Sequence, residues 1–346
     1  MRPARPAAAG VVAALAAAAL LAGAAGTARG QLPLPTPTTP APAPAPTPPT
    51  PIPLLPPGAE PSPGSPAPNP PPPAPPGERC RAAWIGDSSR PGRGVSRTAL
   101  GRAPAAYEVG RPAGRYAGRA ARGIMLLVHG GGWYIVGPGP LVTERGEADR
   151  WRRRGWLTVN LDYPACGASL NGVLWFHDRV RARYGHRLPL CASGASAGGH
   201  LALMLAVRRR DVACVIARGA PTDLRTIDRS ASASGSRDGS KAVAAMADSA
   251  FGRRRRAEMS PVVNAGALHA RLLLATARSD NVIPLSQASA LRAAVRARRG
   301  HAYAAVDFLA AGQIPWIHGP VTRPALSRFY TAERALVRPL VALRRS

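Results

Sequence analysis

The sequence predicts a protein of the α/β class, built on a mostly parallel central sheet with helices on both faces. Apolar runs bounded by Gly or Pro predict buried strands, and Arg- and Ala-rich stretches between them predict helices. Strands that alternate with helices are typical of a parallel sheet covered on both sides. The expected strands are residues 124–128, 157–161, 190–193, 212–217, 272–276 and 304–309. The expected helices are residues 144–154, 174–184, 198–208 and 285–299.

The start of the chain differs in composition from the rest. Residues 1–31 resemble a secretory signal peptide, because Arg2 and Arg5 precede a short apolar run that small-residue cleavage sites follow. The alternative is an uncleaved membrane anchor, but the apolar run is shorter than the roughly 20 residues that a spanning helix needs. Residues 32–77 are dominated by proline, which removes the backbone donor, so we expect a disordered linker. This linker is either a spacer or a dispensable tail.

Residues 78–346 are then left to form one folded domain, and the protein is expected to be secreted or associated with the cell envelope. Its cysteines are Cys80, Cys166, Cys191 and Cys214. An even number in a secreted chain predicts at least one disulfide, with three pairings open. Cys191 and Cys214 fall in expected strands, so buried thiols are the alternative for these two.

The net charge of +28 comes almost entirely from arginine. Apart from the runs at residues 152–154 and 253–256, these arginines are scattered, and they accompany no nucleic-acid-binding module, so we expect no nucleic-acid partner. Solvated surface charge, attracted to an anionic cell envelope, fits the arginines better. No feature predicts an obligate protein partner. No Cys/His or His/Glu spacing indicates a metal site, and we expect no metal or cofactor.

Gly194-Ala195-Ser196-Ala197-Gly198 follows an expected strand and precedes an expected helix. This is the G-x-S-x-G pattern in the setting that the nucleophile elbow requires. The turn is tight, which explains the small residues around Ser196. It exposes the hydroxyl above the sheet beside a helix N-terminus, so Ser196 is the candidate nucleophile.

A second motif, His129-Gly130-Gly131-Gly132-Trp133, follows the strand at residues 124–128. A glycine run lets backbone amides turn toward a developing oxyanion without interference from side chains. We expect the amides of Gly131, Gly132 and Ala197 to form this oxyanion hole. The His129 side chain is expected to hold the loop rather than to carry protons.

With these motifs the sequence resembles the α/β-hydrolase family, in particular the esterases and lipases with an HGGG loop. These are the hormone-sensitive-lipase-like branch and the related carbohydrate-esterase-like group. The resemblance covers roughly residues 124–320, and residues 160–164 (Asn-Leu-Asp-Tyr-Pro) are similar to the family's next strand and loop. It implies an α/β-hydrolase fold, a serine esterase mechanism and a triad in the order Ser, acid, His.

The acid and the base are expected after late strands. Asp280 follows the strand at residues 272–276, and residues 280–284 resemble the family's D-x-x-V/I-P pattern. Carboxyl ends of parallel strands are where sites gather. Asp223, after the preceding strand, is the alternative acid. His318 follows the last expected strand and is the expected base.

The sequence thus predicts a secreted serine hydrolase that cleaves carboxylic esters through an acyl-enzyme. The substrate is expected to be a small-molecule or polymer-linked ester. The alternatives are a peptidase or amidase with the same triad, and a non-enzymatic cell-surface binding protein. We expect Trp133, Tyr134 and Trp316 at the pocket wall. Residues 222–265 are longer than a simple crossover and form either a small lid or a loose loop.

Overall fold

The computed structural model describes residues 80–230, 237–277, 280, 282–299, 304–309 and 323–342. The predicted signal peptide and proline-rich linker lie outside the described residues. Within these ranges, no helix combines the length and the apolar character needed to cross a bilayer.

The described residues fold around an eight-stranded sheet in the order β10-β9-β8-β7-β4-β6-β3-β2. The strands from β10 to β6 in this order run parallel, while β3 pairs antiparallel with β6 and β2 antiparallel with β3. The sheet strands are β2 (Val95–Ser96), β3 (Tyr107–Gly110), β4 (Ile124–Val128), β6 (Leu157–Leu161), β7 (Leu190–Ala195), β8 (Val212–Arg218), β9 (Arg271–Ala277) and β10 (Ala304–Leu309). All six strands expected from the sequence are present.

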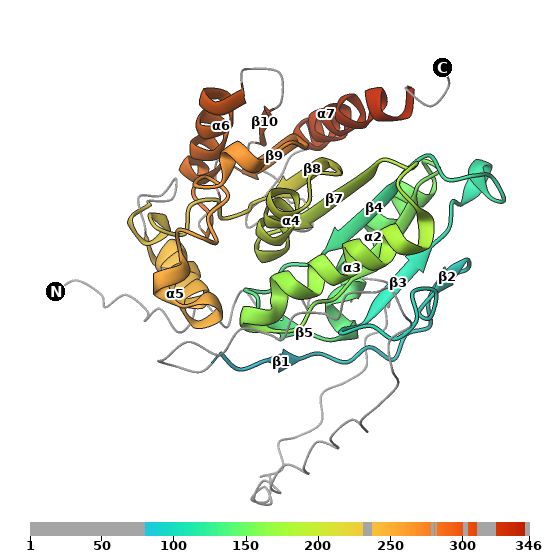
Figure 1. The fold of residues 1–346 in the computed structure, drawn as a ribbon, viewed down its shortest axis with the longest axis horizontal. Coiled ribbons are helices and arrows are strands. Elements are labelled where there is room, and N and C mark those ends of the chain that lie inside the picture. The colour runs from blue at the N-terminus through green and yellow to red at the C-terminus, as the bar shows by residue number, and fades with distance from the viewer. Residues whose placement is uncertain are drawn as a thin grey trace, which may run out of the picture.

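Helices cover both faces of the sheet (Figure 1). The helices are α2 (Pro138–Arg152), α3 (Ser169–Tyr184), α4 (Ala197–Arg208), α5 (Asp238–Phe251), α6 (Leu285–Arg299) and α7 (Arg323–Ala342). Side chains of α3, α4 and α6 pack in one core with Leu126 and Val128. Trp151 of α2 and Phe329 of α7 pack in the other core with Leu127. Alternate residues of β4 therefore face opposite layers, as the strand period requires.

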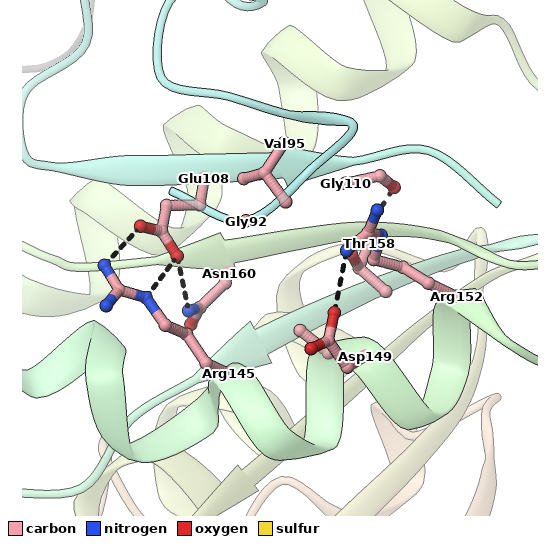
Figure 2. Close-up of a pocket in the computed structure, with 10 residues that line it drawn as sticks. Gly92, Val95, Glu108, Gly110, Arg145, Asp149, Arg152, Thr158 and Asn160 are labelled. Atoms are coloured by element: carbon pink, nitrogen blue, oxygen red, sulfur yellow. Dashed lines mark hydrogen bonds and ion pairs between the residues drawn. The ribbon is translucent and has the colours of Figure 1, made fainter. Parts of the chain in front are cut away.

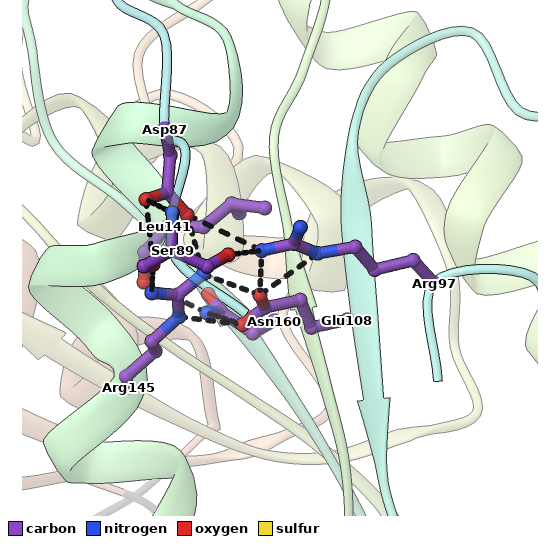
Figure 3. Close-up of polar contacts among 7 residues, drawn as sticks. All are labelled: Asp87, Ser89, Arg97, Glu108, Leu141, Arg145 and Asn160. Carbon is purple, nitrogen blue, oxygen red and sulfur yellow. Dashed lines mark hydrogen bonds and ion pairs between the residues drawn. The ribbon is translucent and has the colours of Figure 1, made fainter. Parts of the chain in front are cut away.

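The first described residues form a strap along α2. Strand β1 (Ala83–Trp84) pairs in parallel with β5 (Ile135–Val136), which follows the glycine loop. Further along, Asp87 and Arg97 join a cluster with Glu108 and Arg145 (Figure 3). Arg145 donates to Glu108 Oε1 at 2.6 Å and to Asp87 Oδ2 at 2.6 Å. The strap is thus tied by hydrogen bonds at one end and by ion pairs at the other.

Two disulfides join the four cysteines. Cys80 bonds Cys166, which fixes the start of the strap to the segment after β6. Cys191 bonds Cys214, and these residues are directly opposite one another on β7 and β8. The disulfide prediction is confirmed, and the alternative of buried thiols at Cys191 and Cys214 is wrong. Direct pairing places the two side chains on the same face of the sheet, close enough to bond.

Candidate active site

Ser196 lies in a sharp turn between β7 and α4. Its backbone has φ 52° and ψ −123°, a strained conformation for a residue with a side chain. The Ser196 amide donates to the Arg218 carbonyl oxygen at 2.8 Å, which ties the turn to the neighbouring strand β8. Ser196 is partly exposed, whereas Ala195 and Ala197 on either side are buried. The strained turn therefore presents one hydroxyl at the carboxyl edge of the sheet, as a nucleophile elbow does.

The glycines of the motif allow the turn to touch the end of β4. A Cβ atom at Gly198 would lie 2.1 Å from the Val128 carbonyl oxygen and 2.3 Å from that of His129. A Cβ at Gly194 would lie 2.5 Å from the backbone of Gly198. Only glycine fits this approach of backbone to backbone. The contact places the loop after β4 beside Ser196.

That loop passes close to the candidate nucleophile. A Cβ at Gly130 would lie 3.5 Å from Ser196 Cβ. Gly131 and Gly132 have φ 112° and 59°, which turn the chain back toward β5. A Cβ at Gly132 would lie 2.6 Å from the Met246 sulfur of α5. Helix α5 therefore packs on the glycine loop, as a lid would, and part of the segment 222–265 is ordered structure.

Backbone amides near Ser196 are free to donate hydrogen bonds to a negatively charged oxygen. Ala197 is the first residue of α4, so its amide has no acceptor within the helix. Among the described residues, the Gly131 and Gly132 amides donate to no acceptor. Amides held in this way beside a nucleophile can stabilise a tetrahedral oxyanion.

His129, Asp162 and Tyr163 hold the glycine loop in place. His129 Nε2 lies 2.9 Å from Asp162 Oδ1, and the Gly137 amide donates to Asp162 Oδ2 at 2.8 Å. Tyr163 stacks on the His129 ring at 4.4 Å and donates from its hydroxyl to the Gly130 carbonyl oxygen at 3.1 Å. His129 is 1% exposed, and the expectation that it has a structural role is confirmed. Asp162 and Tyr163 were singled out only by their resemblance to the family's loop; their function as loop supports emerges from the structure.

Trp133 is placed differently from what the sequence suggested. It is 1% exposed, and its indole nitrogen donates to His200 Nδ1 at 3.2 Å. Its ring also packs edge-on against Phe251 of α5. The ring therefore lies in the interior and does not form an open pocket wall, because α5 covers it. Tyr134, the next residue, is half-buried.

His200 is buried behind the elbow. Its Nε2 lies 2.7 Å from the Met259 carbonyl oxygen, while Nδ1 accepts from Trp133. Burial lowers the pKa of His200 to about 4, and the hydrogen bond to Met259 opposes this only in part. Both ring nitrogens are used inside the protein, so His200 joins α4 to the glycine loop and the segment after α5.

Asp280 lies after β9, at the same edge of the sheet as Ser196. Strand β8 separates β9 from β7, which places the two strand ends roughly 10 Å apart. Asp280 is 1% exposed, and its Oδ1 accepts from the Val282 and Ile283 amides at 2.9 and 2.8 Å. These two bonds fix the orientation of the carboxylate.

Asp223, the alternative acid, forms an ion pair with Arg225. Arg225 donates to both of its oxygens, at 2.9 and 2.8 Å. Burial alone would raise the pKa of Asp223, but the Arg225 guanidinium holds it below its usual value. This pairing favours Asp280 over Asp223 as the residue that orients a base. His318 and Trp316 lie outside the described residues.

A buried ion pair lies behind the elbow, and sequence reasoning missed it. Arg218, whose carbonyl oxygen accepts from Ser196, donates to Glu144 Oε2 at 2.9 Å. Both side chains are almost fully buried, at 2% and 1% exposed. Burial raises the pKa of Glu144, while Arg218 opposes the rise. The sequence predicts surface positions for the arginines, and nothing in the local sequence marks Arg218 as internal.

Two cavities among the described residues lie away from Ser196. One has a volume of about 120 Å³ and lies between α2 and the β2–β3 edge (Figure 2). Its polar walls are bound to one another: Arg145 to Glu108, and Arg152 to Asp149. The second adjoins Asp87 and Arg97 of the strap. Neither touches the elbow or the glycine loop.

Comparison with known proteins agrees with this geometry. A model of the prolyl oligopeptidase family matches residues 179–314, which include Ser196 and Asp280. No curated protein matches the sequence.

Solved structures of similar fold include esterases and peptidases. Esterase B from Lactobacillus rhamnosis is 15% identical with a TM-score of 0.57, and the match covers 74% of this chain and 89% of that one. A bifunctional GH43-CE protein from Bacteroides eggerthii is 16% identical with a TM-score of 0.51, covering 66% and 33%. A puromycin-hydrolysing peptidase from Mycobacterium tuberculosis is 16% identical with a TM-score of 0.52, covering 71% and 39%. The chain spans well under half of the last two proteins. It has the α/β-hydrolase fold, and the family match supports a serine hydrolase of that superfamily.

Proposed function

We propose that the protein is a secreted serine esterase of the HGGG-loop type, with Ser196, Asp280 and His318 as its triad. The observation that carries the proposal is the strained, partly exposed turn at Ser196, packed against the glycine loop. Strain of this kind is retained where the surrounding structure enforces it, typically at functional sites.

The mechanism follows from the roles of these groups. His318 accepts the proton of the Ser196 hydroxyl as its oxygen attacks the ester carbonyl carbon, and Asp280 stabilises the resulting imidazolium. The amides of Gly131, Gly132 and Ala197 stabilise the oxyanion, each contributing on the order of 3 kcal/mol. His318 then protonates the leaving alcohol. Water, deprotonated by the same histidine, attacks the acyl-enzyme, releases the acid and restores the serine.

An ester substrate is supported by the extent of the structural matches. Esterase B is covered over 89% of its length, whereas the puromycin-hydrolysing peptidase is covered over 39%. Secretion is supported by the two disulfides, which persist in oxidising compartments. We further propose that Tyr134 and Trp316 contact the substrate.

A peptidase or amidase is the second candidate, because the matching family model is that of prolyl oligopeptidases. An esterase and a peptidase or amidase would both use Ser196 as the nucleophile, but the first cleaves an ester bond and the second an amide bond.

The test compares the protein with its Ser196→Ala variant. Substrates are nitrophenyl esters from acetate to decanoate and a set of aminoacyl nitroanilides. We expect ester turnover that the variant lacks, and labelling of Ser196 by a fluorophosphonate. Labelling with nitroanilide turnover but no ester turnover would establish the second candidate. Folded protein with neither labelling nor turnover would overturn both.

A further inference from the structure

A group of arginines gathers at the edge of the sheet opposite Ser196. Residues 111–122 lead into the start of β4, and Arg153 precedes the start of β6, whereas Ser196 follows the end of the parallel strand β7. Ile124 at the start of β4 pairs with Leu190, and Ser196 lies six positions beyond Leu190, so at a rise of about 3.3 Å per residue the two edges lie about 20 Å apart. In Figure 1 the teal loop that contains residues 111–122 projects from the molecule at the end away from α5. We call this group the basic loop patch: Arg111, Arg115, Arg119, Arg122 and Arg153.

The loop is held against the C-terminal end of α2. The Ala113 amide donates to the Arg152 carbonyl oxygen at 2.9 Å, and the Arg122 amide to that of Gly155 at 2.9 Å. Between these points a single 3₁₀ turn, Gly114–Tyr116, places Arg115 over the Tyr116 ring, 5.1 Å from its centre. The loop is therefore a fixed platform.

The charges of the patch are not neutralised locally. No Asp or Glu occurs from residue 109 to residue 143. The neighbouring arginines at the end of α2 and just after it are paired, Arg152 with Asp149 and Arg154 with Glu333. Within the described part of the chain, by contrast, no arginine of the patch has a carboxylate within ion-pair distance. All but Arg122 are exposed, so the patch presents a concentrated positive field to solvent.

The chemistry of the patch limits what it can bind. Guanidinium groups form paired hydrogen bonds with the oxygens of phosphate and carboxylate groups, and a linear polymer of phosphates presents such anions at close and regular spacing to several arginines at once. Insertion into a lipid surface would require large apolar side chains, whereas the residues between the arginines are Pro, Ala, Gly and Tyr. Single-stranded nucleic acid would require a free aromatic face, whereas Arg115 and Arg122 lie over the Tyr116 ring.

We propose that the basic loop patch binds a water-soluble linear polymer of phosphate groups, such as a cell-envelope polyphosphate ester. The patch and Ser196 lie at opposite edges of the sheet, so a bound polymer leaves the candidate active site open. This proposal does not depend on the reaction that Ser196 performs.

The test uses two variants of the full chain with the same change in net charge. The patch variant carries Arg115→Ser, Arg119→Ser and Arg153→Ser. The control carries Arg253→Ser, Arg254→Ser and Arg255→Ser in a run where Arg255 already pairs with Glu258. Binding to long-chain polyphosphate is measured against salt concentration, with thermal unfolding to verify folding.

We expect at least a tenfold loss of affinity in the patch variant and little change in the control. The slope of log affinity against log salt should fall by about 2, from three lost phosphate contacts. Ester turnover should not change in either variant. Equal losses in both variants would show an effect of net charge alone and overturn the proposal. Binding of phosphatidylglycerol vesicles or oligonucleotides in preference to polyphosphate, with the same dependence on the patch, would also overturn it.

Discussion

The approach of the elbow to β4 allows a sharp test of the site's geometry through Gly198→Ala. The new Cβ would lie 2.1 Å from the Val128 carbonyl oxygen, and Cβ contacts under 3.0 Å are essentially never seen. The two backbones must therefore separate by at least 0.9 Å, the difference between these distances. The atoms that the new Cβ would meet all belong to the backbone of Val128 and His129, so no flexible side chain can move aside to relieve the clash.

The magnitude follows from that displacement. A misplacement of about 1 Å in a catalytic group can cost about 100-fold in rate. Because the glycine loop and the elbow would move apart, the loss should appear in kcat more than in KM. Forcing a methyl group into a packed region also costs about 1–3 kcal/mol of stability.

The assay is turnover of the best nitrophenyl ester, together with urea unfolding. The matched control is Gly146→Ala, an exposed position in α2 where an added Cβ meets nothing within 4 Å. It should keep full activity and gain about 0.5–1 kcal/mol of stability. A folded Gly198→Ala protein with unchanged kcat would refute the reasoning, because the oxyanion loop would then not depend on this contact.

Three further perturbations test other parts of the structure. Asp280→Asn should lower kcat by about 10⁴-fold, whereas Asp223→Asn should change it little, since Arg225 already occupies that carboxylate; similar small losses in both would contradict the assignment. Replacing Cys80 and Cys166 by serine should reduce the free energy of unfolding by about 4.5 kcal/mol, from their separation of 86 residues; an unchanged urea midpoint would count against this. His200 has a pKa of about 4 when folded against 6.5 when unfolded, so the unfolded chain takes up a proton first as pH falls. Stability should therefore decline between these pH values by about 3 kcal/mol, and His200→Gln should remove that part of the decline in a comparison of urea unfolding at each pH.

The main strands were predictable because they are buried on both faces. A parallel strand covered on both sides appears as a continuous apolar run, and β4 and β6 begin and end where expected. Strand β3 was not expected, because Glu108 interrupts its short apolar pattern. In the structure Glu108 is buried and bound by Arg97 and Arg145, which the sequence places 11 residues before and 37 residues after it.

Helix boundaries were less predictable. Helix α2 begins at Pro138, six positions before the expected start at residue 144. Its Pro-Gly-Pro opening resembles a turn, but proline is tolerated in the first helical turn, where the amide has no partner. Helices α5 and α7 were not expected. Helix α5 is positioned by packing on the glycine loop, and helix α7 by packing on the sheet.

The elbow and the glycine loop could be found from the sequence because their chemistry is local. Each is a short pattern that needs small residues at neighbouring positions. The supports of the site could not be found in this way. Asp162 meets His129 across 33 positions of the chain, and Glu144 meets Arg218 across 74. Trp133 is buried because Phe251, far along the chain, covers it.

The bridge between Cys80 and Cys166 also determines how mechanical tension would enter the domain. The chain arrives at Cys80, so a pull from the preceding segment passes through the two sulfur atoms directly to Cys166. Strand β1 lies inside the closed covalent loop, and its hydrogen bonds to β5, from Ala83 and Ile85, carry none of that force. In a reduced protein the same pull would peel β1 from β5 one bond at a time, beginning beside the glycine loop. Attachment to a moving surface would then distort the loop only after the disulfide is lost.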